Sequence, residues 1–355
     1  MRNCNILVTA RQGTCCCTRN VPQYSNRYQG EQLHILFKTS VWLLIVLACL
    51  SVKICLAINE TNTEKQVAII QVVEHPALDI TRQGILDELK NTKVTIQFQS
   101  AQGNNTLATQ IAQKFIGSSP SILVGIGTPA TQALVVANKQ HQFPIVFTSV
   151  TDPKGAKIVE HLDMPEGMVT GVSNFIDPAL QFDLFKKILP NLISLGIIYN
   201  PGEANSVILN ENMKKIAASK GLQLFFAIAN NSAGIAEATY KLIPEVQAIF
   251  INNDSTALSA FDSIVNIGNK HKIPVFCSDT DMVAHGALAA LGADQYEIGK
   301  QTGEVIIKIL NGESPHQLPV LFPKKMDTKI NLVQASKLGV KIPKSLLETI
   351  NKGQL

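Results

Sequence analysis

The segment Ser194–Ser206, SLGIIYNPGEANS, holds the pattern on which the predicted fold depends. Leu195–Tyr199 is a short apolar run with β-branched and aromatic residues, which predicts a buried strand. The Asn-Pro-Gly sequence at 200–202 ends that strand. Polar residues at 203–206 then precede apolar positions at helical spacing, so they predict the start of a helix. The segment is therefore expected to be a strand, a polar loop and a helix N-terminus.

A junction of this kind is where open α/β sheets bind ligands, because strand ends and helix N-termini meet there. The free N–H groups and the positive end of the helix dipole favour a carboxylate or a phosphate. The alternative is a well-capped turn without any ligand, which is common at such junctions. The ligand interpretation gains weight because the chain repeats the same construction several times.

Strand and helix patterns alternate in two successive series. In the first series, strands are predicted at 66–73, 94–98, 121–124, 144–147 and 168–172, and helices at 77–90, 104–115 and from Pro129 onward. In the second series, strands are predicted at 195–199, 222–227, 246–251, 274–276 and 287–291, and helices at 178–189, 205–220, 233–242, 257–271 and 296–310. The tail from Leu318 is expected to be a short extended piece and a terminal helix. The fold class is therefore α/β, with two doubly wound parallel sheets and a ligand cleft between them.

Composition separates residues 1–57 from the rest of the chain. This segment holds six of the 31 basic residues but one of the 27 acidic residues, so the remainder carries 25 basic against 26 acidic side chains. Without an excess of basic residues, the remainder shows no nucleic-acid footprint, and no nucleic-acid partner is expected.

Cysteine usage shows the same division. Six of the seven cysteines precede residue 58, and only Cys277 follows. The folded part is therefore expected to have no disulfide framework. The run Cys15–Cys17 has no second ligand pair at zinc-finger spacing, so no metal site is predicted.

Residues 1–57 are predicted to be an N-terminal extension with a signal or anchor segment. Val41–Leu50 is an apolar run of 10 residues, too short to span a bilayer stably and of the length of a signal-peptide core. Cleavage after Ala57, lipid modification at Cys49 and retention as an anchor all stay open. Residues 1–35 fit none of these patterns, which suggests that translation begins near 36–41. The folded part is expected to be exported.

Motifs of common catalytic and cofactor sites are absent or incomplete. Gly125, Gly127 and Ala130 have the spacing of a dinucleotide fingerprint, but they follow the third strand, and Pro129 would crowd a pyrophosphate. The sequence has no P-loop, no HExxH and no complete nucleophile elbow, and its histidines do not pair at ligand spacing. No nucleophile–base pair is visible, so no catalytic residue, metal or cofactor is predicted and an enzyme is the least favoured hypothesis.

Acidic side chains follow several of the predicted strands. They are Glu74, Asp152, Glu203, Asp254, Asp279 and Asp281, and Lys154 is the one cation in these loops. Each acid could equally cap the next helix. Taken with the amides, hydroxyls and helix N-termini nearby, they favour a small zwitterion, because carboxylates neutralise an ammonium group and N–H groups a carboxylate. A phosphate would be repelled, and aromatic residues that could stack on a sugar are scarce here.

Five stretches of the chain match a known family. They read VVEHPALD, VGIGTPATQAL, FTSVTDPKGAKIV, IIYNPGEANS and PVFCSDTDMVAHGALAALGADQYEIGKQTG. Together they resemble the substrate-binding proteins of ABC importers related to tryptophan and tyrosine uptake. The resemblance runs from about residue 66 to 315 and does not include residues 1–35. It implies a type I periplasmic-binding fold, in which two α/β lobes joined by three crossings close on an amino-acid-like ligand.

The resemblance also implies boundaries and ligand residues. The N-terminal lobe would comprise 65–174 plus 293–317, and the C-terminal lobe 175–292 plus 318–355. The ligand residues would be Thr128, Pro129, Ser149, Thr151, Asp152, Glu203, Asn205, Ser206, Asn253, Asp254 and Asp279. Glu74 is added to this set because it follows the first predicted strand. Hydroxyl groups among them would donate to a carboxylate, and either Glu203 or Asp279 would hold the ammonium group.

The sequence therefore predicts a non-enzymatic, periplasmic or otherwise extracytoplasmic solute-binding protein of an ABC importer. Its expected ligand is an aromatic or other hydrophobic amino acid, and contacts to both lobes would favour a closed state. The closed protein would dock on a permease and ATPase complex, and a monomer is expected. The residues leave one alternative open, a ligand-sensing receptor of the same fold that signals to a membrane partner.

Overall fold

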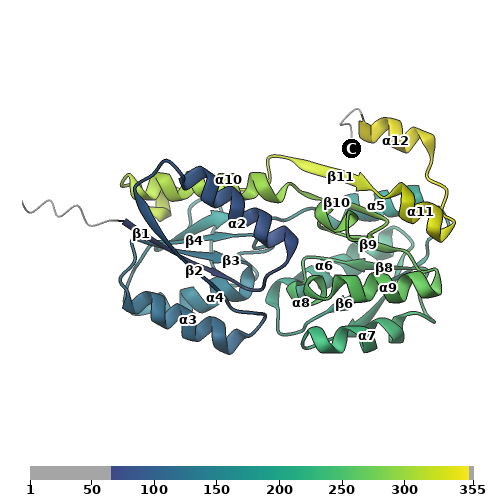
Figure 1. The fold of residues 1–355 in the computed structure, drawn as a ribbon, viewed down its shortest axis with the longest axis horizontal. Coiled ribbons are helices and arrows are strands. Elements are labelled where there is room, and N and C mark those ends of the chain that lie inside the picture. Colours follow the sequence, from purple (N-terminus) through teal and green to yellow (C-terminus); the bar gives the residue numbers. More distant parts are fainter. Residues whose placement is uncertain (1–64, 352–355) are drawn as a thin grey trace, which may run out of the picture. The chain divides into compact units, whose positions relative to one another are not determined.

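The computed structural model describes residues 65–351 (Figure 1). The predicted signal or anchor segment, with Cys49 and the cleavage position at Ala57, lies outside the described residues. Between residues 65 and 351, no helix is long and apolar enough to cross a membrane.

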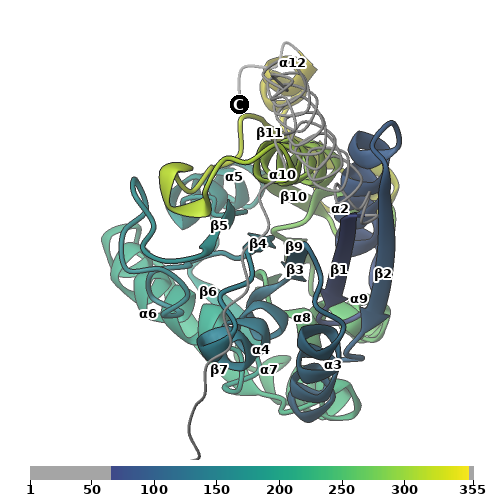
Figure 2. The same ribbon diagram turned by 90° about the vertical axis from the view of Figure 1, so that its left-hand side faces the viewer.

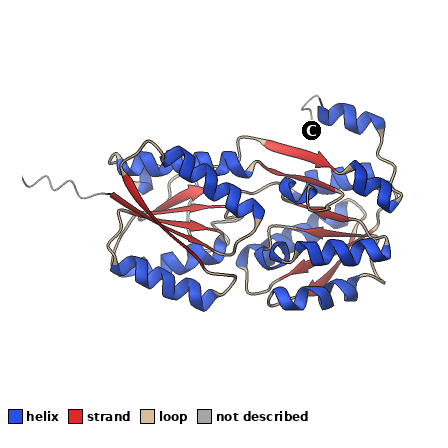
Figure 3. Cartoon of the chain, viewed as in Figure 1, coloured by secondary structure: helices blue, strands red, loops and turns tan. Residues whose placement is uncertain are grey.

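The first sheet consists of five parallel strands in the order β2-β1-β3-β4-β5. Its strands are β1 (Lys65–Gln71), β2 (Val94–Ser100), β3 (Ile122–Ile126), β4 (Ile145–Thr148) and β5 (Val169–Val172). The connecting helices are α2 (Pro76–Leu89), α3 (Asn105–Gly117) and α4 (Thr128–Ala137). Every residue of β3 and β4 is buried, as expected for parallel strands that are covered by helices on both faces (Figure 3).

The second sheet has six strands in the order β11-β10-β9-β8-β6-β7. Its strands are β6 (Ser194–Tyr199), β7 (Gln223–Ile228), β8 (Ala248–Ile251), β9 (Val275–Cys277), β10 (Ala289–Ala293) and β11 (Met326–Ile330). The helices in this part of the chain are α5 (Pro178–Ile188), α6 (Ala204–Ser219), α7 (Ile235–Leu242), α8 (Ser255–Ser259), α9 (Phe261–His271), α11 (Leu332–Leu338) and α12 (Lys344–Asn351). The α/β class and the two mostly parallel sheets are thus confirmed.

The structure differs from the sequence prediction at two places in the second sheet. The helix predicted at 257–271 is two helices that meet at Ala260, where φ is −117° and ψ is 25°. The extended piece predicted in the tail is strand β11, which joins the second sheet and runs antiparallel to β10, whereas the predicted strands of both sheets are parallel. The reason is connectivity: the chain re-enters the sheet beside Ala293, where β10 ends, so it can only run back along that strand. An antiparallel strand is tolerated there because it lies at the edge of the sheet.

Helix α10 (Gln295–Leu310) links the two sheets, because it follows β10 of the second sheet but lies along α2 of the first (Figures 1 and 2). Glycines allow the two helices to approach closely. A Cβ atom on Gly299 would lie 2.1 Å from the carbonyl oxygen of Thr81, and one on Gly84 would lie 2.4 Å from that of Tyr296. The chain around 318–321 also belongs beside the first sheet, since Leu321 N donates to the carbonyl oxygen of Gly171 in β5 at 2.9 Å.

Each sheet is the centre of its own apolar cluster, and Leu321 packs against both clusters. One cluster contains Ile69, Ile85 and Phe115 of the first sheet and its helices, and it includes Ile306 of α10. Another surrounds the second sheet, where the ring of Phe185 lies 4.2 Å from that of Phe276, centroid to centroid. We call each sheet with the helices packed on it a lobe; the residue boundaries predicted for the two lobes stay a proposal.

Candidate ligand-binding site

Loops at the carboxyl ends of the strands bring the predicted ligand residues together from both lobes. Asn253, after β8, donates from Nδ2 to the hydroxyl oxygen of Thr151, after β4, at 3.2 Å. Thr151 in turn donates to Oδ1 of Asn174 at 3.1 Å, and Ser278 donates to Oδ1 of Asn253 at 2.7 Å. The two lobes are therefore in direct hydrogen-bonded contact at the place where the sequence predicts the cleft.

Burial distinguishes the members of the predicted set. Nine of them are buried, namely Thr128, Pro129, Ser149, Thr151, Glu203, Asn205, Ser206, Asp254 and Asp279. Asp152 and Asn253 are partly buried, and Glu74 is exposed. Asp152 accepts a hydrogen bond from the N–H of Gly155 at 2.8 Å, which makes it a turn residue of its own loop. Glu74 borders two grooves between the lobes, of about 170 and 380 Å³.

The N-terminus of α4 is an uncapped helix end in the first lobe. Its N-cap residue, Gly127, has φ 91°, and a Cβ atom there would lie 2.7 Å from a methyl carbon of Val72. No side chain caps the helix. The Thr128 side chain is 2% exposed, and its hydroxyl has no hydrogen-bond partner among the described residues. Because the first N–H groups of a helix lack intrahelical partners, this end can receive an anionic oxygen.

Ser149 lies next to this helix end. It directly follows β4, which pairs with β3, and Gly127 N donates to the carbonyl oxygen of Thr148 at 2.9 Å. Ser149 has φ 53°, a conformation that non-glycine residues rarely adopt and that is concentrated at functional sites. Thr128 and Ser149 therefore lie at neighbouring strand ends of the first sheet.

Two of the predicted acids are occupied by contacts within the second lobe. Glu203 accepts from the N–H of Ser255 and the N–H of Thr256, each at 2.9 Å, and from the Thr256 hydroxyl at 2.7 Å. Asp254 accepts from Asn200 N and the Ser206 hydroxyl at 2.7 Å and from Ala257 N at 2.8 Å. Both carboxyl groups thus cap the short helix α8.

Burial also shapes the charge of this pair. It raises the pKa of Glu203, which the hydrogen bonds from Ser255 and Thr256 offset in part. Burial, and then the nearby Glu203 charge, raise the pKa of Asp254 to about 8. Two buried carboxyl groups close to each other favour the state in which one keeps its proton.

Asp279 differs from these two acids because one of its carboxylate oxygens has no hydrogen-bond partner among the described residues. Oδ1 accepts from Nε2 of Gln295 at 2.8 Å, and no hydrogen bond to Oδ2 is found within the described residues. The residue is 3% exposed. Burial, with a smaller contribution from the neighbouring Asp281 charge, raises the pKa of Asp279 to about 7. An ammonium group at Oδ2 would stabilise its ionised form.

The amide and hydroxyl residues of the second lobe serve mainly to hold these loops. Asn205 donates from Nδ2 to the carbonyl oxygen of Asn253 at 2.7 Å, while its Oδ1 is buried without a partner in the described part of the chain. Ser206 is fully buried against Asp254. Their ligand roles therefore stay predictions, and Oδ1 of Asn205 is an acceptor that has no partner among the described residues.

Two residues that the sequence reasoning did not select belong to the same network. Gln295, at the start of α10, bonds Asp279, and Thr81 of α2 donates to Oε1 of Gln295 at 3.1 Å. Gln295 could have been found by the rule used above, since it stands between a predicted strand and a predicted helix. Thr81 could not, because it lies within a helix and carries no local signal.

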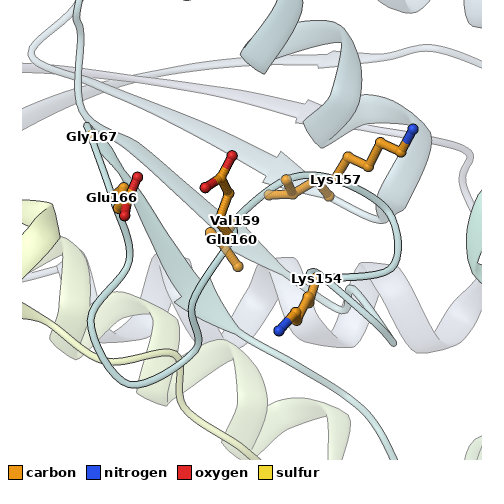
Figure 4. Close-up of a pocket in the computed structure, with 7 residues that line it drawn as sticks. Lys154, Lys157, Val159, Glu160, Glu166 and Gly167 are labelled. Carbon is orange, nitrogen blue, oxygen red and sulfur yellow. The ribbon is translucent and has the colours of Figure 1, made fainter.

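A second pocket, of about 560 Å³, lies in the loop after β4 and has a different character (Figure 4). Its lining carries both signs of charge, with Lys154 and Lys157 opposite Glu160 and Glu166. Glu160, His161 and Glu166 have ligand atoms within 4.8 Å of one another, but all three side chains are exposed. This pocket lacks the buried, unpartnered polar groups that mark the site between the lobes.

The buried acids predict a pH dependence of stability in the ligand-free protein. The ordinary pKa of an aspartate is 3.8, whereas Asp254 and Asp279 titrate at about 8 and about 7 in the folded state. Between these pKa values, the two aspartates keep their protons in the folded protein but have lost them in the unfolded chain. The resulting stabilisation is fully present below about pH 4 and is lost as the pH rises through 7 and 8.

His75 acts in the opposite direction, because burial lowers its pKa from 6.5 to about 4. Its contribution is present above pH 6.5 and is lost as the pH falls to 4. We therefore expect the free energy of unfolding in urea to decrease between pH 6.5 and 9, with a shallower decrease in Asp279→Asn. An increase over that range would contradict the assignment.

Comparisons with known proteins agree with this architecture. A model of the family described as ABC transporter substrate binding protein matches residues 66–353. A tyrosine-binding protein of Clostridioides difficile is 30% identical over 279 residues, which are 77% of this chain and 80% of that protein.

Two solved structures extend the comparison. The ABC domain from Streptococcus pneumoniae in complex with L-Trp has a TM-score of 0.77 at 32% identity, covering 81% of this chain and 98% of that one. The ligand-free, open structure of a substrate-binding protein with adhesive properties from Clostridium difficile has a TM-score of 0.60 at 31% identity, covering 79% of this chain and 96% of that one. The predicted family and fold are thereby confirmed, and the chain belongs to the ABC transporter substrate-binding proteins.

Proposed function

We propose that this substrate-binding protein takes up an aromatic or other hydrophobic L-amino acid between its two lobes and delivers it to the permease and ATPase of an ABC importer. The observation that carries the proposal is the placement of an uncapped helix end in one lobe and a half-paired buried carboxylate in the other. These are complementary to the two charges of an amino acid.

The carboxylate of the ligand would bind at the first lobe. The N-terminus of α4 offers free N–H groups, and the buried Thr128 hydroxyl has no partner in the described residues. Ser149 lies on the adjoining strand end. A buried hydroxyl without a partner is unfavourable in the ligand-free protein, so an arriving carboxylate oxygen would satisfy it.

The ammonium group would bind at Asp279. Glu203, the other acid proposed from the sequence, already accepts three hydrogen bonds at the N-terminus of α8, whereas Asp279 accepts one. An ammonium group can donate to the free Oδ2 without displacing any protein contact. Asp254 is disfavoured for the same reason as Glu203.

The aromatic character of the ligand rests on the relatives. One is named a tyrosine-binding protein and another was solved with L-Trp. The arrangement of this chain also has a higher TM-score with the L-Trp complex than with the ligand-free, open structure, at almost equal identity. This difference, together with the Thr151–Asn253 hydrogen bond between the lobes, supports a closed conformation as the one described.

Export and anchoring are part of the proposal. The apolar segment at 41–50 would direct the chain out of the cytoplasm, with cleavage after Ala57 or lipid modification at Cys49. The protein would act as a monomer. The intact mass of the mature protein would distinguish a cleaved chain from a lipid-modified one.

The experiment is to titrate the purified protein with L-tyrosine and L-tryptophan and to follow its shape by small-angle X-ray scattering. We expect binding, a rise in melting temperature and a smaller radius of gyration, because a ligand that touches both lobes stabilises the closed state. Tyramine and tryptamine, which lack the carboxylate, serve as matched controls and should bind much more weakly. Binding without compaction would argue for a site within one lobe, and equal affinity for the amines would exclude Thr128 and Ser149 as the site of the ligand carboxylate.

A further inference from the structure

Gln295 occupies the junction between the two lobes. It is the first residue of α10, where the chain leaves the second sheet and begins to pack on the first lobe, and its side chain is 4% exposed. Its amide makes one bond in each direction: Nε2 donates to Asp279 of the second lobe at 2.8 Å, and Oε1 accepts from Thr81 of the first lobe at 3.1 Å.

The polar contacts continue from Thr81 to Ser149, which is proposed to bind the ligand carboxylate. The Thr81 hydroxyl lies 3.4 Å from the hydroxyl of Ser149, and it also lies 3.1 Å from the carbonyl oxygen of Ala77. Thr81 has a single hydroxyl hydrogen for three neighbouring oxygens. Loss of the Gln295 acceptor would leave that hydrogen to Ala77 O and the Ser149 hydroxyl.

We infer that Gln295 is a positioning residue that couples the two halves of the ligand site, holding Asp279 with its amide nitrogen and Thr81 with its amide oxygen. The inference rests on the proposed function. An ionised carboxylate only accepts, and Thr81 can donate, so the orientation with Nε2 toward Asp279 and Oε1 toward Thr81 satisfies both bonds. Gln295 thereby keeps Oδ1 of Asp279 occupied and leaves Oδ2 for the ammonium group.

The other charged or titratable groups around Asp279 are few. Asp281 lies in the one-turn helix Thr280–Val283 that follows Asp279, and its Oδ1 is 3.4 Å from the ammonium group of Lys329 on β11. The thiol of Cys277 on β9 accepts from the Asp279 N–H at 3.4 Å, and burial keeps its pKa well above the usual range, so it is uncharged. Gln295 is thus the hydrogen-bond donor found at the Asp279 side chain among the described residues.

The test uses Gln295→Met, which keeps the length of the side chain and removes both polar groups. The dissociation constant for L-tryptophan is measured from pH 6 to 9. Asp279 must be ionised to bind an ammonium group, and losing a donor raises its pKa. We expect affinity at pH 7 to fall about tenfold or more and the pH midpoint of binding to move up by about one unit.

Gln301→Met is the matched control. Gln301 lies on the same helix, is 2% exposed, and its amide has no hydrogen-bond partner in the described part of the chain. A purely structural role for a buried glutamine would affect both variants alike. We expect the midpoint of Gln301→Met to stay at the parental value, and an equal shift in both variants would overturn the inference.

A double variant tests the coupling itself. If Gln295 acts on Ser149 through Thr81, Gln295→Met combined with Ser149→Ala should lose less affinity than the product of the two single losses. Strictly multiplicative losses would overturn the coupling.

A ligand-free measurement separates the two possible failures. If the parent protein binds neither L-tyrosine nor L-tryptophan, the proposed function fails. The pKa of Asp279, followed by carboxyl NMR without ligand, then still tests Gln295. An upward shift in Gln295→Met supports the inference, and an unchanged value refutes it.

Discussion

Asp279→Asn is expected to lower the affinity for L-tryptophan by roughly 30-fold to several thousand-fold while leaving the protein folded. Removing one partner of a buried, hydrogen-bonded charge pair costs about 2–5 kcal/mol in binding, because the remaining charge is left unpaired. Asparagine keeps the shape of the side chain and an oxygen for Gln295 to bond. The loss therefore reports the charge at Oδ2, and calorimetric titration at pH 8, where the parent carboxylate is ionised, measures it.

Glu203→Gln is the informative comparison. Glu203 holds the N-terminus of α8 through Ser255 and Thr256. Its loss should therefore lower the melting temperature while changing the affinity little. Asp262→Asn, an exposed acid on α9, should change neither quantity. If Glu203→Gln abolished binding and Asp279→Asn did not, the ammonium group would have to be assigned to Glu203 instead.

Gly299→Ala is expected to destabilise the protein by about 3 kcal/mol. The added Cβ would lie 2.1 Å from the carbonyl oxygen of Thr81 and 3.0 Å from Cα of Gly84. These are backbone atoms, so no side-chain rotation relieves the clash, and α2 and α10 must move apart. Because α10 begins at Gln295, that movement should also weaken amino-acid binding.

Gly117→Ala provides the control for this prediction. Gly117 also lies within a helix, but a Cβ atom there meets nothing within 4 Å. Alanine should therefore be neutral or slightly stabilising through its higher helix propensity. Urea unfolding of both variants measures the difference, and equal stabilities would show that the α2–α10 contact does not require glycine.

Most of the fold follows from local pattern. The apolar run at 195–199 is strand β6, and the polar residues after it begin helix α6. Asp254 was expected at a helix start and does cap one, because a short acceptor side chain before a helix reaches the N–H groups two or three residues later. Such signals act over a few residues and can be identified without the rest of the chain.

Contacts between distant residues decided what the sequence left open. Glu203 and Asp279 both follow a strand in the sequence, so their local patterns are equivalent. Both are also buried, so burial does not distinguish them. They differ because Ser255 and Thr256, some fifty residues away in sequence, occupy both oxygens of Glu203, whereas Gln295 occupies one oxygen of Asp279. The partner of a carboxylate is set by packing, which no window of sequence contains.

The sequence by itself thus determined the class of fold, the order of its elements and the edge of each sheet at which polar side chains gather. The tertiary structure alone decided that β11 runs antiparallel, that a helix breaks at Ala260, and which acid keeps an oxygen free. The physical reason is the range of the interactions. Periodicity and capping are local, whereas strand direction and hydrogen-bond satisfaction depend on where the chain returns in space.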